Sequence, residues 1–348
     1  MNRNYGIDLL RLVLMFMVCI LHTLGQGGIL KASTVGTIGY QVFWLVEIMA
    51  YCAVDGFAFI SGYTASNKPQ KYSKIVEMWF QAFFYSFVLT VIFYVVGIRG
   101  KLELNALWKL AFPVTNNSFW YFTAYVVLFF AIPILNKFIF ALEEGTAKKI
   151  FLITVTLFSV VGIMGDPFRT RNGYSAIWLL VLYLIGALAK QIKLFEKKRT
   201  VTLLILWCVC IFSTWWVQIF MENKILVNYI SPTILLSGII LVVLFSRLRP
   251  NETIVRKLSP LAFGVYLFQM NTVIWKYILK GATSFIVEKP IVLGVCYIFG
   301  CAALIFVCGL LVEYIRIKLA KVFRIPFLSE KIVNCLDKIL ERISICLK

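Results

Sequence analysis

The chain has 348 residues, of which 61% are hydrophobic, 16% aromatic and only 15% charged, and its mean hydropathy is +0.88. Soluble domains carry about 45–50% apolar and about 25% charged residues, so the composition excludes an ordinary soluble protein and predicts an integral membrane protein. A formal net charge of +19 would suit nucleic acid, but most of it falls on one side of the predicted membrane segments, where topology and anionic lipid headgroups account for it, so we expect no nucleic-acid binding.

A membrane-spanning helix needs about 20 mainly apolar residues, because the hydrocarbon core offers no water to satisfy backbone N–H and C=O groups. Ten segments meet this requirement, although the fifth and sixth are short, and we predict an all-α integral membrane protein with about ten transmembrane helices in one bundle. The predicted spans are approximately residues 7–24, 38–60, 75–97, 119–141, 150–165, 176–189, 201–220, 229–246, 261–279 and 290–312.

Lysine and arginine accumulate in the cytoplasmic loops of membrane proteins. If the N-terminus is cytoplasmic, most of the 35 Lys and Arg residues fall on the cytoplasmic side, with dense groups in the 190–199 loop and from Arg316 onwards. We therefore predict that both termini are cytoplasmic. The first span should be retained, because Asp8 and Arg11 interrupt the apolar stretch that a cleavable signal peptide would need.

The sequence shows no internal repeat and no low-complexity linker, so residues 1–320 are expected to form one transmembrane domain. Residues 321–348 form a cytoplasmic tail, in which Ile332, Leu336 and Leu340 recur at helical spacing beside charged residues. This pattern predicts an amphipathic helix that lies along the inner leaflet, with a partner-binding helix as the alternative.

Side chains with reactive or ionisable groups are few within the predicted spans. The nine cysteines are odd in number and most lie in apolar segments, which indicates small core residues and neither a disulfide framework nor a metal site. Ionisable residues inside a membrane are costly, and each is a functional hypothesis by default. They are Asp8, Arg11, His22, Glu47, Asp55 and Lys276.

Arg11 and His22 are eleven residues apart on the first span, which is about three turns and about 16 Å along a helix. Such a pair shares a face without touching and can hold two ends of one extended substrate. Arginine suits phosphate and imidazole titrates near neutral pH, so the separation fits the phosphopantetheine arm of an acyl-CoA. Plainer interpretations stay open: Asp8 and Arg11 form a structural ion pair, or the single histidine is a hydrogen-bonded bundle residue.

Three further segments carry weaker signals. TLGQGG, residues 23–28, would supply flexible backbone and exposed N–H groups after His22. In DGFAFISGY, residues 55–63, Ser61-Gly62 is expected to break the helix and let the backbone approach a ligand. Trp120, Tyr121 and Tyr125 open a helix from the outer face, either as an interfacial anchoring belt or as a stacking surface for sugar rings.

Taken together, these segments resemble the acyltransferase family 3 proteins, which are multi-pass membrane O-acyltransferases of bacterial envelopes. The resemblance covers almost the whole bundle, and five segments occur in the order of the family. They are GIDLLR leading into the spacing from Arg11 to His22, AFISGY at 58–63, FWYFTAYVVLFFAIPILN at 119–136, IWLLVLYLIGALA at 177–189 and SPLAFGVYLF at 259–268.

The resemblance implies an enzyme of the bacterial plasma membrane that takes an acyl group, typically acetyl, from cytoplasmic acyl-CoA. The acceptor would be a hydroxyl of an extracytoplasmic or lipid-linked sugar of exopolysaccharide, capsule or cell wall. Arg11 and His22 would be the essential pair, with His22 as general base or transient acyl carrier and Arg11 in CoA binding or pore structure. Acyl-CoA would be a donor substrate, with no bound cofactor and no metal. The candidate substrate-binding residues are Asp8, Glu47, Asp55, Ser61, Gly62, Tyr63, Trp120, Tyr121, Tyr125, Tyr266 and Gln269.

The chain departs from the family pattern in FGVYLFQ, residues 263–269, where Gln269 stands in place of a histidine of many relatives. Glutamine can hydrogen-bond but cannot take a proton, so a two-histidine mechanism is excluded. His22 would then work alone or with a carboxylate, either Asp8, Glu47 or Asp55. Asp55 is the least favoured, because it should lie toward the cytoplasmic side while His22 lies nearer the outer side.

A transporter or flippase for a glycan precursor is the main alternative, since intramembrane Arg, Asp and His also suit a transport pathway. Against it, no pair of Gly/Pro-interrupted segments recurs in two matching halves. A polysaccharide polymerase or ligase is a third interpretation, but such enzymes commonly have a large extracytoplasmic loop, and the longest one here is about residues 98–118.

Overall fold

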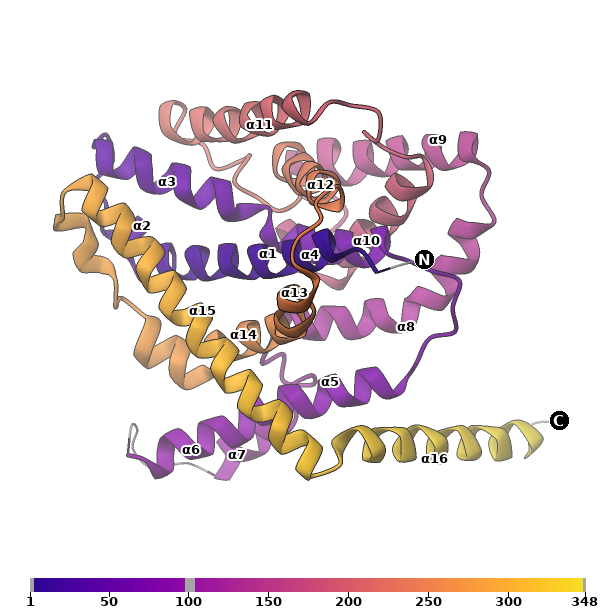
Figure 1. The fold of residues 1–348 in the computed structure, drawn as a ribbon. Helices are drawn as coiled ribbons and strands as arrows, with labels where there is room; N and C mark the ends of the chain where they lie inside the picture. The colour runs from indigo at the N-terminus through magenta and orange to yellow at the C-terminus, as the bar shows by residue number, and fades with distance from the viewer. Residues whose placement is uncertain (1–2, 98–103, 347–348) are drawn as a thin grey trace.

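The computed structural model describes residues 3–97 and 104–346, and within these ranges every regular element is a helix (Figure 1). Seven helical stretches of the described chain are long and apolar enough to cross a membrane. The predicted all-α integral membrane fold is therefore confirmed, while the sidedness of the two termini stays a prediction. The seven stretches are Tyr5–Ala32, Ile38–Tyr63, Ser73–Val95, Trp120–Phe140, Glu144–Met164, Thr200–Phe220 and Ile291–Val322.

The helices follow one another along the chain with short connections. Up to residue 97 they are α1 (Tyr5–Leu24), α2 (Ile29–Ala32), α3 (Ile38–Tyr51), α4 (Ala53–Tyr63), α5 (Ser73–Phe83), the π-helical η1 (Phe84–Val88) and α6 (Leu89–Val95). From 104 to 191 they are α7 (Leu104–Ala111), α8 (Trp120–Phe140), α9 (Glu144–Val155), the π-helical η2 (Thr156–Val161), the short 3₁₀ turns η3 (Gly162–Met164) and η4 (Arg171–Gly173), and α10 (Ala176–Gln191). The rest are α11 (Thr200–Phe220), α12 (Pro232–Ser246), α13 (Glu252–Leu258), η5 (Ser259–Leu261), α14 (Ala262–Gln269), the π-helical η6 (Ile274–Leu279), η7 (Ser284–Glu288), α15 (Ile291–Val322) and α16 (Ile325–Cys346).

Most of the predicted spans correspond to these helices. The sixth and eighth are α10 and α12, which are apolar but shorter than the seven long stretches. The fifth is longer than expected, because α9 begins at Glu144. Of the predicted outer loop 98–118, residues 98–103 lie outside the described residues, and the part from Leu104 to Ala111 is helical.

The ninth predicted span, residues 261–279, is not one continuous helix, which corrects the sequence interpretation. α14 ends at Gln269 and η6 begins only at Ile274. Between them the buried Asn271 donates from Nδ2 to the backbone oxygen of Tyr85 at 2.6 Å, and its Oδ1 accepts from the N–H of Ile274 at 3.3 Å. A side chain that satisfies backbone groups in this way ends one helix and caps the next.

Helix α1 occupies the middle of the bundle. It packs against α3, α4, α12, α14 and α15, and residues around its whole circumference are buried. Figure 1 shows α11 and α5 near opposite edges of the bundle, and α15 crossing the other helices obliquely. The residues of α1 therefore face protein, and its polar side chains project toward neighbouring helices.

Helices α4 and α10 approach each other at glycines, which corrects the interpretation of Ser61-Gly62. α4 continues to Tyr63 without a break. A Cβ on Gly62 would lie 1.9 Å from the backbone oxygen of Tyr183, and a Cβ on Gly186 would lie 2.3 Å from that of Phe59. Gly62 thus permits close backbone approach as predicted, but the partner is another helix of the bundle and not a ligand.

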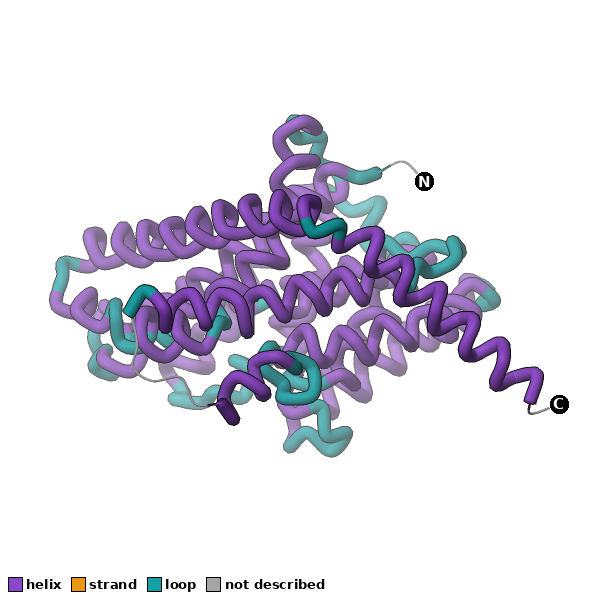
Figure 2. The backbone as a smooth tube through the Cα atoms, turned by 90° about the horizontal axis from the view of Figure 1, so that it is seen from below, coloured by secondary structure: helices purple, strands orange, loops and turns teal. Residues whose placement is uncertain are grey.

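The amphipathic helix α16 leaves the bundle at its C-terminal half. Its first half packs on α5, where Ile332 lies in a groove with Ile75 and Trp79. Figures 1 and 2 show the rest projecting beyond the spans, at the end of the bundle where the N-terminus also lies. The position of this helix along the inner leaflet stays a prediction, since its contacts with α5 place it against the bundle and not against a membrane.

The described cysteines are all free thiols. Cys19, Cys52 and Cys210 are buried, as expected for small core residues. Cys208 and Cys296 are exposed on the surface of the spans, so the core interpretation is wrong for these two.

Candidate active site

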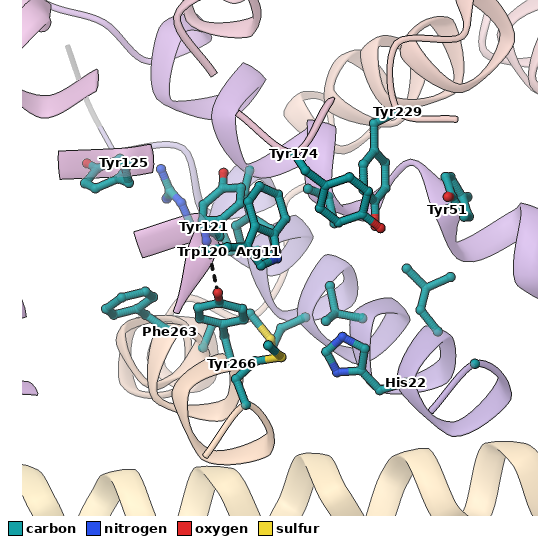
Figure 3. Close-up of a pocket in the computed structure, with 18 of the residues that line it drawn as sticks. Arg11, His22, Tyr51, Trp120, Tyr121, Tyr125, Tyr174, Tyr229, Phe263 and Tyr266 are labelled. Carbon is teal, nitrogen blue, oxygen red and sulfur yellow. Dashed lines mark hydrogen bonds between the residues drawn. The ribbon is translucent and has the colours of Figure 1, made fainter. Parts of the chain in front are cut away.

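A cavity of about 540 Å³ lies inside the bundle beside α1 (Figure 3). Side chains of α1, α3, α4, α8 and α14 line it, together with Tyr174 and Tyr229 from two loops. Much of the remaining wall is apolar, as at Met15, Val18 and Phe263. The predicted site residues that line the cavity are Arg11, His22, Glu47, Ser61, Trp120, Tyr121, Tyr125 and Tyr266.

Arg11 reaches the cavity from the first half of α1. The helix begins after Asn4, whose side chain caps the N–H of Ile7, and an acidic residue in the first turn suits the positive end of the helix dipole. That residue is Asp8, a buried carboxylate that forms ion pairs with both Arg11 and Arg3. The predicted pairing of Asp8 with Arg11 is confirmed, and Asp8 fixes the guanidinium from outside the lining of the cavity.

His22 lies three turns further along α1, on the same cavity (Figure 3). Its Nδ1 is 2.9 Å from Oε1 of Gln269, and the amide nitrogen of that glutamine lies 3.8 Å from Sδ of Met15. Because an amide oxygen only accepts hydrogen bonds, we assign the hydrogen to Nδ1, which leaves Nε2 of His22 as an acceptor. Gln269 therefore selects the tautomer that a general base requires.

Trp275 packs against the other side of the His22 ring. The two ring centroids are 4.8 Å apart in an edge-to-face arrangement. Gln26 donates to the backbone oxygen of Trp275 at 2.9 Å, which connects the end of α1 to the π-helical η6. The imidazole is thus held between Gln269 and Trp275, with its plane and its tautomer both fixed.

The glycine-rich stretch after His22 is a docking segment, which corrects the expectation of exposed N–H groups. The backbone N–H groups of Gly25, Gly27 and Gly28 all donate to carbonyl oxygens of the same chain segment. A Cβ on Gly27 would lie 2.0 Å from Oγ1 of Thr283, so this turn packs closely against the segment that follows η6. Gly25 and Gln26 line the cavity, and the stretch offers few backbone donors to a substrate.

The predicted residues of α4 divide between the cavity and the protein interior. Ser61 lines the cavity, whereas Asp55 accepts a hydrogen bond from Nε1 of Trp178 at 2.9 Å and does not line it. Tyr63 also lies outside the lining, beneath the ammonium group of Lys190 at 5.0 Å. Of Ser61, Gly62 and Tyr63, only Ser61 is therefore placed to meet a substrate in this cavity.

The aromatic residues at the start of α8 face the cavity. Trp120, Tyr121 and Tyr125 all line it, and the N–H of Tyr121 donates to the hydroxyl of Tyr266 at 3.2 Å (Figure 3). Figure 3 also shows Tyr125 beside Arg11. Because the three rings line the cavity, the structure favours the stacking surface over the anchoring belt.

Three tyrosines of the cavity were not among the predicted site residues. Tyr51 ends α3, Tyr174 follows η4, and Tyr229 precedes α12. No spacing in the sequence relates them, since they come from three separate segments. The one local signal in the sequence is the glycine before Tyr174, because glycine often marks a tight turn. In the structure Gly173 does adopt a φ of +96°.

A comparison with known proteins found one family. A family model described as an acyltransferase domain matches residues 4–310, a range that includes every residue of the cavity. Comparisons with curated proteins and with solved structures found no match. Within the described residues, no group of three His, Cys, Asp or Glu side chains is placed to hold a metal ion.

Proposed function

This chain belongs to the acyltransferase 3 family of multi-pass membrane proteins, and we propose that it is an O-acetyltransferase of the bacterial plasma membrane. The donor is acetyl-CoA, which binds from the cytoplasmic side at Arg11. The acceptor is a hydroxyl of an extracytoplasmic or lipid-linked sugar of exopolysaccharide, capsule or cell wall. No bound cofactor takes part in the proposed reaction.

The observation that carries this proposal is that one cavity connects Arg11 with His22. Their separation along α1 is about 16 Å, which suits an extended pantetheine arm with phosphates at the guanidinium and the thioester near the imidazole. Arginine holds phosphate well because its donors form a rigid fork. Apolar side chains between the two residues, such as Met15 and Val18, can cover the arm and exclude water.

The proposed reaction uses the free Nε2 of His22. This nitrogen takes the proton of the acceptor hydroxyl as the hydroxyl oxygen attacks the thioester carbonyl carbon. The C–S bond then breaks, and the imidazolium returns the proton to the departing CoA thiolate. Gln269 acts as a positioning residue, because its bond to Nδ1 keeps Nε2 directed at the substrate.

The test is acetyl transfer from radiolabelled acetyl-CoA in inverted membrane vesicles that contain the wild type, His22→Ala or Arg11→Ala at matched protein levels. Arg256→Ala is the control, because Arg256 is exposed on α13 and does not line the cavity. We expect label in glycan or lipid-linked material with the wild type and the control only. Full incorporation by His22→Ala would refute the reaction, and export of unmodified glycan precursor without label would favour a transporter.

A further inference from the structure

One side of the cavity is a continuous surface of aromatic rings, which we call the aromatic wall. It consists of Trp120, Tyr174, Tyr229 and Tyr51. The ring centroids of successive members are 4.8, 4.9 and 4.8 Å apart. Figure 3 shows Tyr174, Tyr229 and Tyr51 in a row above His22. A wall of this kind offers stacking area in the cavity that His22 also lines.

The loop that carries Tyr174 is held rigidly over the cavity. Asp166 accepts hydrogen bonds from the backbone N–H and the hydroxyl of Thr170, at 2.7 and 2.6 Å. Asn228 donates to Asn172 at 2.9 Å, which ties this loop to the one that carries Tyr229. Because both loops are fixed to each other, the wall exists before any substrate arrives.

Glu47 lies on the same cavity with an unsatisfied carboxylate oxygen. The residue is only 7% exposed, and its Oε2 has no hydrogen-bond partner among the described residues. No ion pair of the described chain includes it. Burying an acceptor without a donor is unfavourable, so this oxygen is suited to receive hydrogen bonds from a bound molecule.

The other two candidate carboxylates do not line the cavity. Asp8 is paired with two guanidinium groups. One oxygen of Asp55 accepts from Trp178, and Asp55 does not line the cavity. Of the three carboxylates that the sequence offered as partners of His22, only Glu47 can meet a substrate in this cavity.

We propose that Glu47 and the aromatic wall form the acceptor subsite, which takes a neutral, hydroxyl-bearing sugar ring. The faces of the ring stack on the tyrosines, and one hydroxyl donates to Glu47 while another is presented to His22. Neither Glu47 nor the aromatic wall offers a cation, so a phosphate or carboxylate on the bound ring would find no partner in this subsite. This inference rests on the proposed function and deepens it, since it separates where the acceptor binds from where the donor binds.

The experiment measures donor and acceptor saturation separately in purified, nanodisc-embedded protein. Radiolabelled acetyl-CoA is the donor, and two fractions of the source cell envelope serve as acceptors, a water-soluble polymer fraction and a solvent-extracted lipid-linked fraction. The fraction that accepts label identifies whether the sugar is presented on a polymer or on a lipid carrier. Each variant is then titrated with that fraction at saturating acetyl-CoA, and with acetyl-CoA at a fixed amount of acceptor.

For Glu47→Gln we expect the half-saturating amount of acceptor to rise about 5- to 150-fold, because an amide nitrogen at the position of Oε2 cannot accept the sugar hydroxyl, with half-saturating acetyl-CoA unchanged. Tyr174 is 46% exposed, so its substitution should not prevent folding. Tyr174→Leu should weaken the acceptor in the same selective way, while Tyr174→Phe, which keeps the ring, should not. The controls are Glu252→Gln and Tyr314→Leu, at exposed positions outside the cavity.

An active wild type whose acceptor saturation is unchanged by Glu47→Gln and by Tyr174→Leu would overturn the subsite and leave the proposed function intact. An equal shift in donor and acceptor saturation would also overturn it, because the subsite would then not be specific to the acceptor. A wild type that labels neither fraction would refute the proposed function itself, and this inference with it.

Discussion

Replacing Gln269 by leucine should slow acetyl transfer by about 5- to 150-fold. Gln269 is fully buried and its Oε1 accepts from Nδ1 of His22 at 2.9 Å. Leucine cannot accept this hydrogen, and leaving a buried donor unsatisfied costs about 1–3 kcal/mol. The imidazole can avoid that cost only by moving its hydrogen to Nε2 or by rotating, and either change removes the base from the acceptor hydroxyl. With about 1.4 kcal/mol per tenfold in rate, the expected loss follows directly.

Gln269→Glu provides the contrast, because a carboxylate can still accept from Nδ1 of His22. We expect it to retain far more activity than the leucine variant. Gln191→Leu is the control for loss of a glutamine elsewhere, since Gln191 bonds the backbone of Leu142 and does not line the cavity.

The assay is the initial rate of label transfer in inverted vesicles, with folded protein quantified by size-exclusion chromatography in detergent. Full activity of a folded Gln269→Leu would refute the view that Gln269 positions His22. Equal losses in the leucine and glutamate variants, in proportion to lost folded protein, would show that Gln269 has only a structural role.

The remaining predictions concern Asp8, the contact between α4 and α10, and the loop that carries Tyr174. Asp8→Asn removes the partner of Arg11, so half-saturating acetyl-CoA should rise about tenfold or more, and an unchanged value in the vesicle assay would contradict a positioning role for Asp8. Gly62→Ala should destabilise the protein by about 1–3 kcal/mol, because its methyl group would clash with the backbone of α10. Gly300→Ala is the control, since a methyl group there meets nothing within 4 Å. Thermal unfolding in detergent compares the two variants, and equal midpoints would refute the clash. Burial alone would raise the pKa of Asp166, but hydrogen bonds from Thr170 and nearby backbone N–H groups outweigh it and hold that pKa below its ordinary value. The hydrogen bonds of the Asp166 carboxylate therefore hold the loop above about pH 4 and are lost as the pH falls through the lowered pKa. Protection of the Thr170 amide against hydrogen exchange should fall on acidification in the wild type but not in Asp166→Asn.

Hydrophobic length predicted the helical bundle well, because each span must satisfy its own backbone in hydrocarbon. It could not show the break in the ninth span, where a single buried side chain, Asn271, takes over the bonding of the backbone. An asparagine in an apolar run has the same appearance in the sequence whether it faces lipid headgroups or caps a helix. Its partners, Tyr85 and Thr90, are about 180 residues away and become known only from the packing.

The two ends of the candidate site were predictable because they lie on one helix. The 3.6-residue period places Arg11 and His22 on one face, and the structure brings both to one cavity. The aromatic wall was not predictable, because Tyr51, Tyr174 and Tyr229 come from segments with no common period. A glycine that lets a ligand approach the backbone has the same appearance in the sequence as one that lets another helix approach it. The interpretation of Gly62 as a ligand contact was wrong for this reason, because its neighbour is α10.

Gln269 is a direct neighbour of the proposed base, since its Oε1 lies 2.9 Å from Nδ1 of His22. A glutamine there accepts one hydrogen bond and exchanges no proton, so it can orient the imidazole but cannot relay its charge. The imidazolium formed in the reaction therefore has to return its proton to the leaving thiolate. With a single histidine, attack of the acceptor hydroxyl and departure of the CoA thiolate should therefore be tightly coupled. In this proposal Glu47 holds the acceptor ring and does not take its proton.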